Sequence, residues 1–271
     1  MTGYAAVVAA RFRMLLQYRG AALGGLATQT FFGLVRIMIL DGFYRASATP
    51  PSLGFPQAVG YVWLGQATLA LFPWNTDSEI RDQVRKGTVV YELCRPLDLY
   101  GLWYARAIAW RSAPTLLRMI PMFAFAAAVL PALGLGDWGL APPAGVGAGI
   151  AWVAATVGAL FLSCALTTLA HVGVLATLGA DGVPALMATI ASLLGGMVIP
   201  LPLFPDWAQG LLAALPFSGA LDLPARLYVG HIAAADAVWV LAQQLSWTAI
   251  LVVLGRWLLA RQTRRLVVQG G

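Results

Sequence analysis

Long uncharged segments alternate with short polar segments along most of the chain. The uncharged segments are 21–39, which only Arg36 interrupts, and 55–74, 119–136, 138–180, 182–205 and 237–255. A helix needs about 20 mostly apolar residues to cross a bilayer. Backbone amides in lipid must be hydrogen-bonded within their own segment, which favours helices over open sheet. The pattern therefore predicts an all-α integral membrane protein.

The number of crossings depends on how the longest uncharged segment is divided. Residues 138–180 are enough for two helices, but Gly173, Gly179 and the lack of a polar turn in the middle favour one long helix and a loop. Six transmembrane helices are then expected, in one domain over residues 1–271. Their expected ranges are 21–41, 56–74, 111–131, 143–171, 183–200 and 236–258.

The composition excludes an ordinary soluble domain. The chain is 60% hydrophobic and 10% charged, whereas soluble domains carry roughly 25% charged residues. The formal net charge is +6, but the arginines flank apolar segments instead of forming one basic face. Nucleic-acid binding is therefore not expected.

The basic residues predict the orientation, because short loops rich in Arg and Lys stay cytoplasmic. With six crossings, Arg45 and Arg226 fall on one side. The side that holds both termini carries Arg11, Arg13, Arg19, Arg81, Arg85, Lys86, Arg95, Arg106, Arg111, Arg261, Arg264 and Arg265. Both termini are therefore expected in the cytoplasm.

Two segments are expected at the membrane surface instead of across it. Residues 4–19 place Val8, Phe12 and Leu15 on one face, which favours an interfacial elbow helix over a longer first transmembrane helix with a solvated start. Residues 200–217 are apolar but rich in proline. They are too short and broken to span, which favours an outer re-entrant hairpin over an ordinary loop.

Residues 77–100 form the one dense run of mixed charge, with nine charged side chains. A short helix is predicted over 78–86, because Asp77 or Ser78 suits its N-cap, Glu79 suits its first turn and Gly87 suits its end.

This short helix is expected to lie against another surface. Ile80 and Val84 are four residues apart and give it one apolar ridge, while the rest of its surface is charged. The alternative is a solvated helix resting on the lipid.

Sequence signals of an enzyme are missing. A phosphate-binding P-loop needs a lysine followed by Ser or Thr, and the one lysine, Lys86, precedes glycine. His171 and His231 are expected on opposite sides of the membrane, so they do not form a metal site. Cys94 and Cys164 are expected in a loop and a span, so no disulfide is predicted.

Signals of an ion-driven carrier are missing too. Arg36 lies near the outer end of the first helix, where it can snorkel or pair near Asp41. No acidic residue is expected at mid-span, which argues against coupling to protons or sodium. Energy for any uphill transport must then come from another protein.

Residues 79–100 resemble the permease subunits of the second type of ATP-binding-cassette (ABC) transporters. The matching positions are Glu79-Ile80-Arg81, then Gly87, then Glu92-Leu93-x-Arg95-Pro96-Leu97-Asp98-Leu99-Tyr100, where the family reads E-I-x…G…E-L-L-R-P-x-D. Cys94 stands where the family often has Leu. These residues look most like the bacterial branch in which a six-helix permease is encoded apart from its ATPase, and this likeness implies the bacterial inner membrane.

This resemblance implies that the short helix is a coupling helix seated in a groove of a cytoplasmic ATPase. Its implied contacts are Glu79, Ile80, Arg81, Asp82, Val84, Arg85 and Lys86. Glu92, Arg95 and Asp98 are implied to brace the loop or the elbow. The family further implies export, a second identical or homologous permease, and two ATPases that bind the ATP and Mg, with no cofactor in this chain.

Two other classes of function stay open. A stand-alone carrier or channel predicts internal repeats and midplane charges, and neither is found. A membrane scaffold that recruits a cytoplasmic protein is the second alternative. Co-purification of a P-loop ATPase separates the transporter from both. The substrate is not predicted, although an apolar and aromatic interior suits an amphiphile, a lipid or a drug-like cation.

Overall fold

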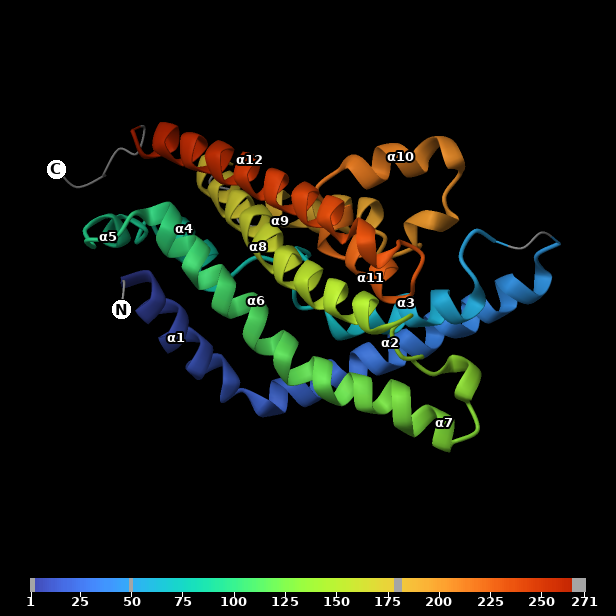
Figure 1. The fold of residues 1–271 in the computed structure, drawn as a ribbon. Coiled ribbons are helices and arrows are strands. Elements are labelled where there is room, and N and C mark those ends of the chain that lie inside the picture. The colour runs from blue at the N-terminus through green and yellow to red at the C-terminus, as the bar shows by residue number, and fades with distance from the viewer. Residues whose placement is uncertain (1–2, 49–50, 178–181, 265–271) are drawn as a thin grey trace.

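The computed structural model describes residues 3–48, 51–177 and 182–264 (Figure 1). The described residues form helices joined by turns, with no strand among them. Arg265, one of the basic residues used to predict the orientation, lies outside this range. The helices are α1 Gly3–Leu16, α2 Arg19–Ala46, α3 Phe55–Ala67, α4 Ser78–Arg85, α5 Val90–Leu93, α6 Leu99–Ala124, α7 Leu130–Ala132, α8 Val146–Thr177, α9 Gly182–Leu194, α10 Asp206–Ala214, α11 Asp222–Tyr228 and α12 Ala237–Thr263.

Short turns connect several of these helices. A π-helical turn, Phe125–Val129, joins α6 to α7 without a break, so the two run as one rod. The 3₁₀ turns are Gly136–Trp138, Leu201–Leu203, Ser218–Ala220 and Ala234–Asp236. The segment expected as a re-entrant hairpin thus holds one 3₁₀ turn and α10, and its depth in the membrane stays a prediction.

Four helical stretches among the described residues are long and apolar enough to cross a bilayer. They are Arg19–Ala46, Leu99–Ala132, Val146–Thr177 and Ala234–Thr263. The remaining two predicted crossings are only partly helical, because α3 and α9 have 13 residues each. At 1.5 Å per residue this is about 20 Å, less than the ~30 Å hydrocarbon core. Six full-length helical crossings are therefore not confirmed.

α6 begins at Leu99, well before the predicted start at residue 111. Its first turn is capped by Asp98, whose Oδ2 accepts a hydrogen bond from the backbone N–H of Gly101 at 2.8 Å. Trp103 and Arg106 on the following turns are buried against other parts of the chain. The charged start of α6 is thus helical because protein covers it.

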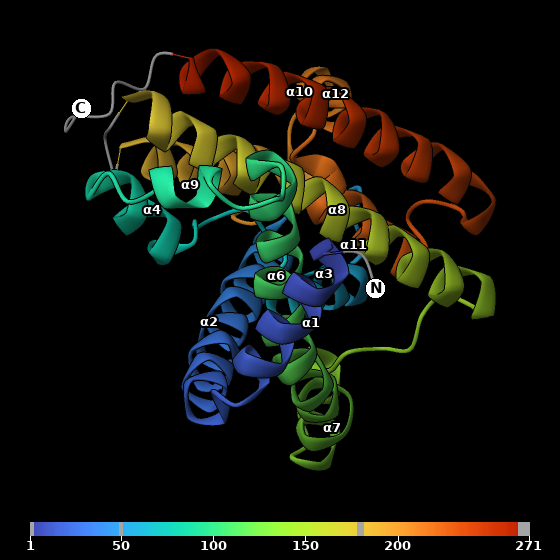
Figure 2. The same ribbon diagram turned by 90° about the vertical axis from the view of Figure 1, so that its left-hand side faces the viewer.

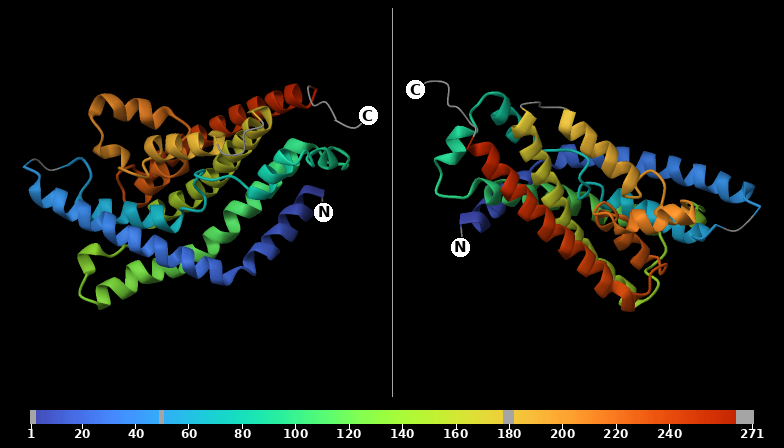
Figure 3. Two further views of the ribbon diagram at one scale, coloured as in Figure 1. Left: turned by 180° about the vertical axis from the view of Figure 1, so that it is seen from behind. Right: turned by 90° about the horizontal axis from the view of Figure 1, so that it is seen from above.

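The helices form two groups that cross each other (Figures 1 and 2). In one group α1 packs along α6, and α2 packs against α3 and α6. In the other α8 packs along α12 and contacts α9 and α11. Contacts of α6 with α8 and of α3 with α11 join the groups. The N-terminal end of α1 and the last turn of α12 lie at one end of the molecule with α4 and α5, here named the α4 end, while α7 lies at the other (Figures 1 and 3).

The centre of the fold is α3, in which residues 58–67 are all buried. The fully buried ring of Trp63 donates its Nε1–H to the carbonyl of Trp138 at 2.7 Å. α2 passes close because Gly33 faces this ring; a Cβ at Gly33 would lie 2.8 Å from it. Residues 58–67 of α3 are therefore covered by protein.

Replacing Trp63 with alanine tests this central position. We expect Trp63→Ala to lower the free energy of unfolding by about 3–5 kcal/mol, since it leaves a large cavity in the core. The measurement is thermal or denaturant unfolding of the detergent-purified protein. The control is Trp239→Ala, whose side chain is 76% exposed. Equal losses in both variants contradict the central role of α3.

Candidate functional site

α4 forms for local reasons that the sequence already indicates. Asp77 is its N-cap, with Oδ1 accepting from the backbone N–H of Glu79 at 2.9 Å. Glu79 in the first turn and Arg85 in the last turn agree with the helix dipole. Gly87 follows with a φ of +70°, a conformation that residues with a Cβ rarely adopt. These features hold α4 to Ser78–Arg85.

The apolar ridge of α4 faces the protein's own interior. Ile80 is 0% and Val84 is 4% exposed, and both lie in one cluster with Trp103 of α6, Val172 of α8 and Leu259 of α12. The chain itself therefore covers the ridge in this structure, and the contact of Ile80 and Val84 with an ATPase stays a prediction. The implied contact residues that remain accessible are Glu79, Arg81, Asp82, Arg85 and Lys86.

A buried guanidinium holds the start of α4. Arg106 of α6 is 4% exposed. Its Nη2 lies 3.1 Å from Asp77 Oδ2 and 3.1 Å from Glu79 Oε2, and its Nη1 lies 2.9 Å from Glu92 Oε1. Trp103 Nε1 donates to the second oxygen of Glu92 at 2.9 Å. We name these five side chains the Arg106 network. It joins α4, α5 and α6.

Two further helices reach the same point. Arg11 of α1 pairs with Glu79 and lies 3.8 Å from Asp77 Oδ2. On the other side, the backbone N–H of Asp77 donates to His171 Nε2 of α8 at 3.0 Å. An accepting Nε2 requires the neutral tautomer with its proton on Nδ1. The N-terminus of α4 is therefore bound to α1, α6 and α8 together.

The residues expected to brace the loop differ in what they contact. Glu92 is buried in the Arg106 network. Asp98, besides capping α6, donates its backbone N–H to Tyr4 Oη at 3.1 Å and pairs with Arg256 of α12 at 3.5 Å. Arg95 is exposed, and no described residue pairs with it. Glu92 and Asp98 thus connect neighbouring helices, and Arg95 does not.

The segment between α3 and α4 has its own anchor. Arg111, fully buried on α6, donates to the carbonyl of Phe72 at 2.6 Å and to Asn75 Oδ1 at 3.0 Å. It also donates to Thr167 Oγ1 of α8 at 2.9 Å. This side chain holds the segment that leads into α4 against α6 and α8.

The geometry at the α4 end is that of a charged surface helix fixed rigidly to two long helices. A family model described as ABC-2 family transporter protein matches residues 55–270 of the chain. The chain belongs to the ABC-2 transporter family. Comparisons with curated proteins and with solved structures found no match. The matched range contains α4 and all of the Arg106 network.

Membership of the ABC-2 transporter family makes the chain a multi-pass membrane protein and a permease of an ABC transporter. Permeases of this family are transport components without an ATPase of their own and typically work with an ATPase partner. Within the described ranges, no three His, Cys, Asp or Glu side chains are grouped as a metal site requires. Cys94 and Cys164 are free.

Two polar clusters were not identified from the sequence. From the sequence, Arg106 and Arg111 are expected at the cytoplasmic start of the third helix, with no partners assigned to them. Their spacing from Trp103 within an apolar segment was the available signal for a buried face. At the opposite end, the fully buried Asp222 accepts from Tyr61 Oη at 2.9 Å and pairs with Arg226 at 3.3 Å.

The second cluster continues to a histidine in the loop after α11. Arg226 Nε donates to His231 Nδ1 at 3.2 Å, and burial followed by the positive charge of Arg226 lowers the pKa of His231. Nearby, Asp41 pairs with Arg45 at 3.0 Å. Asp41, which was suggested as a partner for Arg36, is thus paired with Arg45. Arg36 lines a small cavity together with Tyr61.

Removing the central guanidinium tests the Arg106 network. We expect Arg106→Gln to destabilise the protein by about 3–5 kcal/mol, since it leaves Glu92 buried without its cation and removes the nearer of the two cations beside Asp77. The measurement is the unfolding midpoint of the purified protein. The matched control is Arg95→Gln in the same segment, for which we expect a change within about 0.5 kcal/mol. Equal stability of the two variants contradicts the network.

Proposed function

We propose that the chain is the permease of an ATP-driven exporter and that α4 is the coupling helix that docks into a cytoplasmic ATPase. The observation that supports this most directly is the two-sided character of α4. Its apolar face is buried against α6, α8 and α12, while Asp82, Arg85 and Lys86 are exposed on the other face. A charged face of this kind suits a polar groove on a soluble partner.

The contacts of α4 connect it to two long helices, so that a movement of α4 can be passed on to them. Arg106 fixes the start of α4 to α6, and His171 fixes it to α8. A partner that moves α4 therefore moves two of the four long helices with it. ATP shifts the equilibrium only through contacts that differ between two states. In this proposal those contacts are made by the exposed charges of α4 rather than by its apolar ridge.

A second permease completes the pathway in this proposal. Large apolar side chains are exposed on α2 and α12, including Phe31 at 62% and Val253 at 68%. Such surfaces are covered by lipid or by another protein. We propose that an identical or homologous permease covers part of them, that two ATPases bind below, and that both termini lie in the cytoplasm of a bacterial cell.

The docking role of α4 is tested with charge removal on its exposed face. We expect Asp82→Ala/Arg85→Ala to lower the affinity for the ATPase by about tenfold or more, since α4 then loses two of the charged side chains that contact the ATPase in this proposal. Transport-coupled ATP hydrolysis in proteoliposomes should fall with it. The measurements are ATPase co-purification and hydrolysis rate.

The matched control is Asp41→Ala/Arg45→Ala, which removes an exposed Arg–Asp pair at the opposite end of the molecule. We expect it to leave ATPase binding unchanged. Normal coupling in the α4 variant counts against the proposal. If the wild-type protein binds the ATPase but proteoliposomes show no transport of solute, the result favours the alternative of a membrane scaffold that recruits a cytoplasmic protein.

The two native cysteines test the orientation. Cys94 is exposed beside α5, whereas Cys164 is fully buried in α8. A membrane-impermeant maleimide should therefore label the wild type once, in inside-out vesicles only, and Cys94→Ser should abolish the labelling. Asp206→Cys in the Cys94→Ser background should be labelled only in right-side-out vesicles. Labelling of Cys94 from the outer side contradicts the proposed docking in the cytoplasm.

A further inference from the structure

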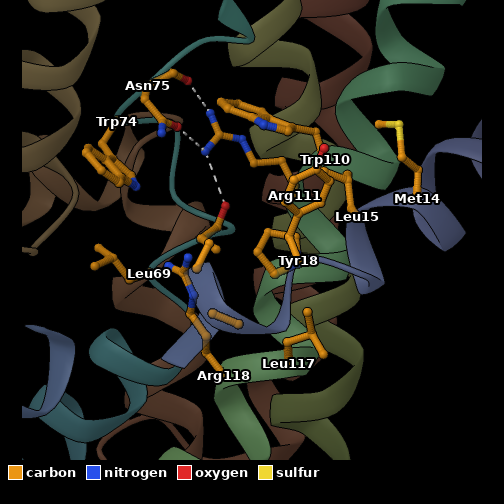
Figure 4. Close-up of a pocket in the computed structure, with 14 residues that line it drawn as sticks. Met14, Leu15, Tyr18, Leu69, Trp74, Asn75, Trp110, Arg111, Leu117 and Arg118 are labelled. Atoms are coloured by element: carbon orange, nitrogen blue, oxygen red, sulfur yellow. Dashed lines mark hydrogen bonds between the residues drawn. The ribbon is translucent and has the colours of Figure 1, made fainter. Parts of the chain in front are cut away.

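A cavity of about 480 Å³ lies where α1, α2 and α6 meet the segment between α3 and α4 (Figure 4). Its lining includes two arginines, Arg111 and Arg118, and no acidic side chain. Both arginines come from α6 and are seven residues apart, which places them on one face of the helix. The cavity therefore has one positively charged wall.

Arg118 brings a charge to this wall without a counter-charge. Its Nε is buried with no hydrogen-bond partner, and no described carboxylate forms an ion pair with it. The guanidinium lies against α2 at Gly25, where an added Cβ would be 2.4 Å from Arg118 Cζ. The side chain as a whole is half-buried, and a charge partly withdrawn from water without a partner is unfavourable. The site therefore suits an anion from outside the chain.

Arg111 supplies a second positive charge. Its partners are the carbonyls of Ala70, Phe72 and Asn75, the Asn75 side chain and the Thr167 hydroxyl, all of them neutral. These groups satisfy its donors but do not neutralise it. Figure 4 shows Arg111 and Arg118 both reaching toward the segment that carries Leu69 and Asn75.

The rest of the lining is apolar and aromatic. Leu15, Leu69 and Leu117 contribute alkyl groups, and Tyr18, Trp74 and Trp110 contribute rings. Tyr18 is the residue directly before α2, one of the helices that can cross the membrane. A helix that enters the bilayer there brings the cavity to the level of the lipid headgroups, where Tyr and Trp are enriched.

We propose that this cavity binds the phosphate-bearing headgroup of an anionic phospholipid, with Arg118 pairing to the phosphate and Arg111 adding positive potential. Arginine forms paired hydrogen bonds to phosphate, and basic cavities between transmembrane helices hold anionic headgroups. The alkyl and aromatic lining accommodates the glycerol and the upper acyl chains, which a free phosphate ion lacks. This site is separate from the charged face of α4, so it stands or falls independently of ATPase docking.

Native mass spectrometry of the purified protein tests the site with three probes. These are phosphatidylglycerol, phosphatidylcholine and inorganic phosphate, each added to protein in neutral detergent. We expect one phosphatidylglycerol molecule to be retained, with at least about tenfold preference over phosphatidylcholine. Inorganic phosphate should not bind comparably. High salt should weaken retention, since the pairing is electrostatic.

Two variants locate the binding. Arg118→Gln removes the charge and should reduce phosphatidylglycerol retention about tenfold or more, while Arg13→Gln, on the exposed part of α1, should not. Gly25→Ala keeps every charge but displaces the Arg118 guanidinium, and should reduce retention as well. Its matched control is Gly24→Ala, where an added Cβ meets nothing within 4 Å.

Several outcomes overturn the proposal. Equal retention of the two lipids shows that the headgroup charge is not recognised. Equal binding of inorganic phosphate shows a free-anion site instead of a lipid site. Unchanged retention in both Arg118→Gln and Gly25→Ala shows that the lipid binds elsewhere on the protein.

Discussion

The charge of Arg106 cannot reach water, and the α4 end of the molecule is organised around it. An uncompensated buried ion costs several kcal/mol, so Arg106 requires the carboxylates of Asp77, Glu79 and Glu92 around it. Asp77 and Glu79 lie at the start of α4, while Glu92 lies in α5 beyond it. The same guanidinium therefore fixes both sides of the exposed charged helix, and it does so from one of the four helical stretches that are long and apolar enough to cross a membrane.

α4 itself could be predicted from local chemistry, but the residues that surround it could not. The N-cap, the charges of the first and last turns and Gly87 all act within a few residues, so the range predicted for α4 from sequence agrees with the structure to within one residue. The carboxylate partners of Arg106 are between 14 and 29 residues away. A ridge such as Ile80 and Val84 shows that one face will be covered, but it carries no information on whether the chain or a partner covers it.

Hydropathy predicted where apolar helices occur but not what surrounds them. α3 has the composition of a membrane-spanning helix, yet it is short and buried on every side by protein around Trp63. α6 was predicted to start at residue 111, but it begins at Leu99, and protein covers Trp103 and Arg106 in this earlier part of the helix. Tyr61 and Asp222 are 161 residues apart, so no local pattern could pair them.

The segment between α3 and α4 connects the cation-lined cavity to the proposed docking helix. Arg111 holds Asn75 on the cavity wall, and Arg106 holds Asp77 two residues later. Asn75 and Asp77 are thus each fixed to α6, with one residue between them. The proposed headgroup would therefore lie beside the segment that leads into α4. Any coupling between this cavity and docking at α4 would be reciprocal, each ligand changing the affinity for the other by the same factor.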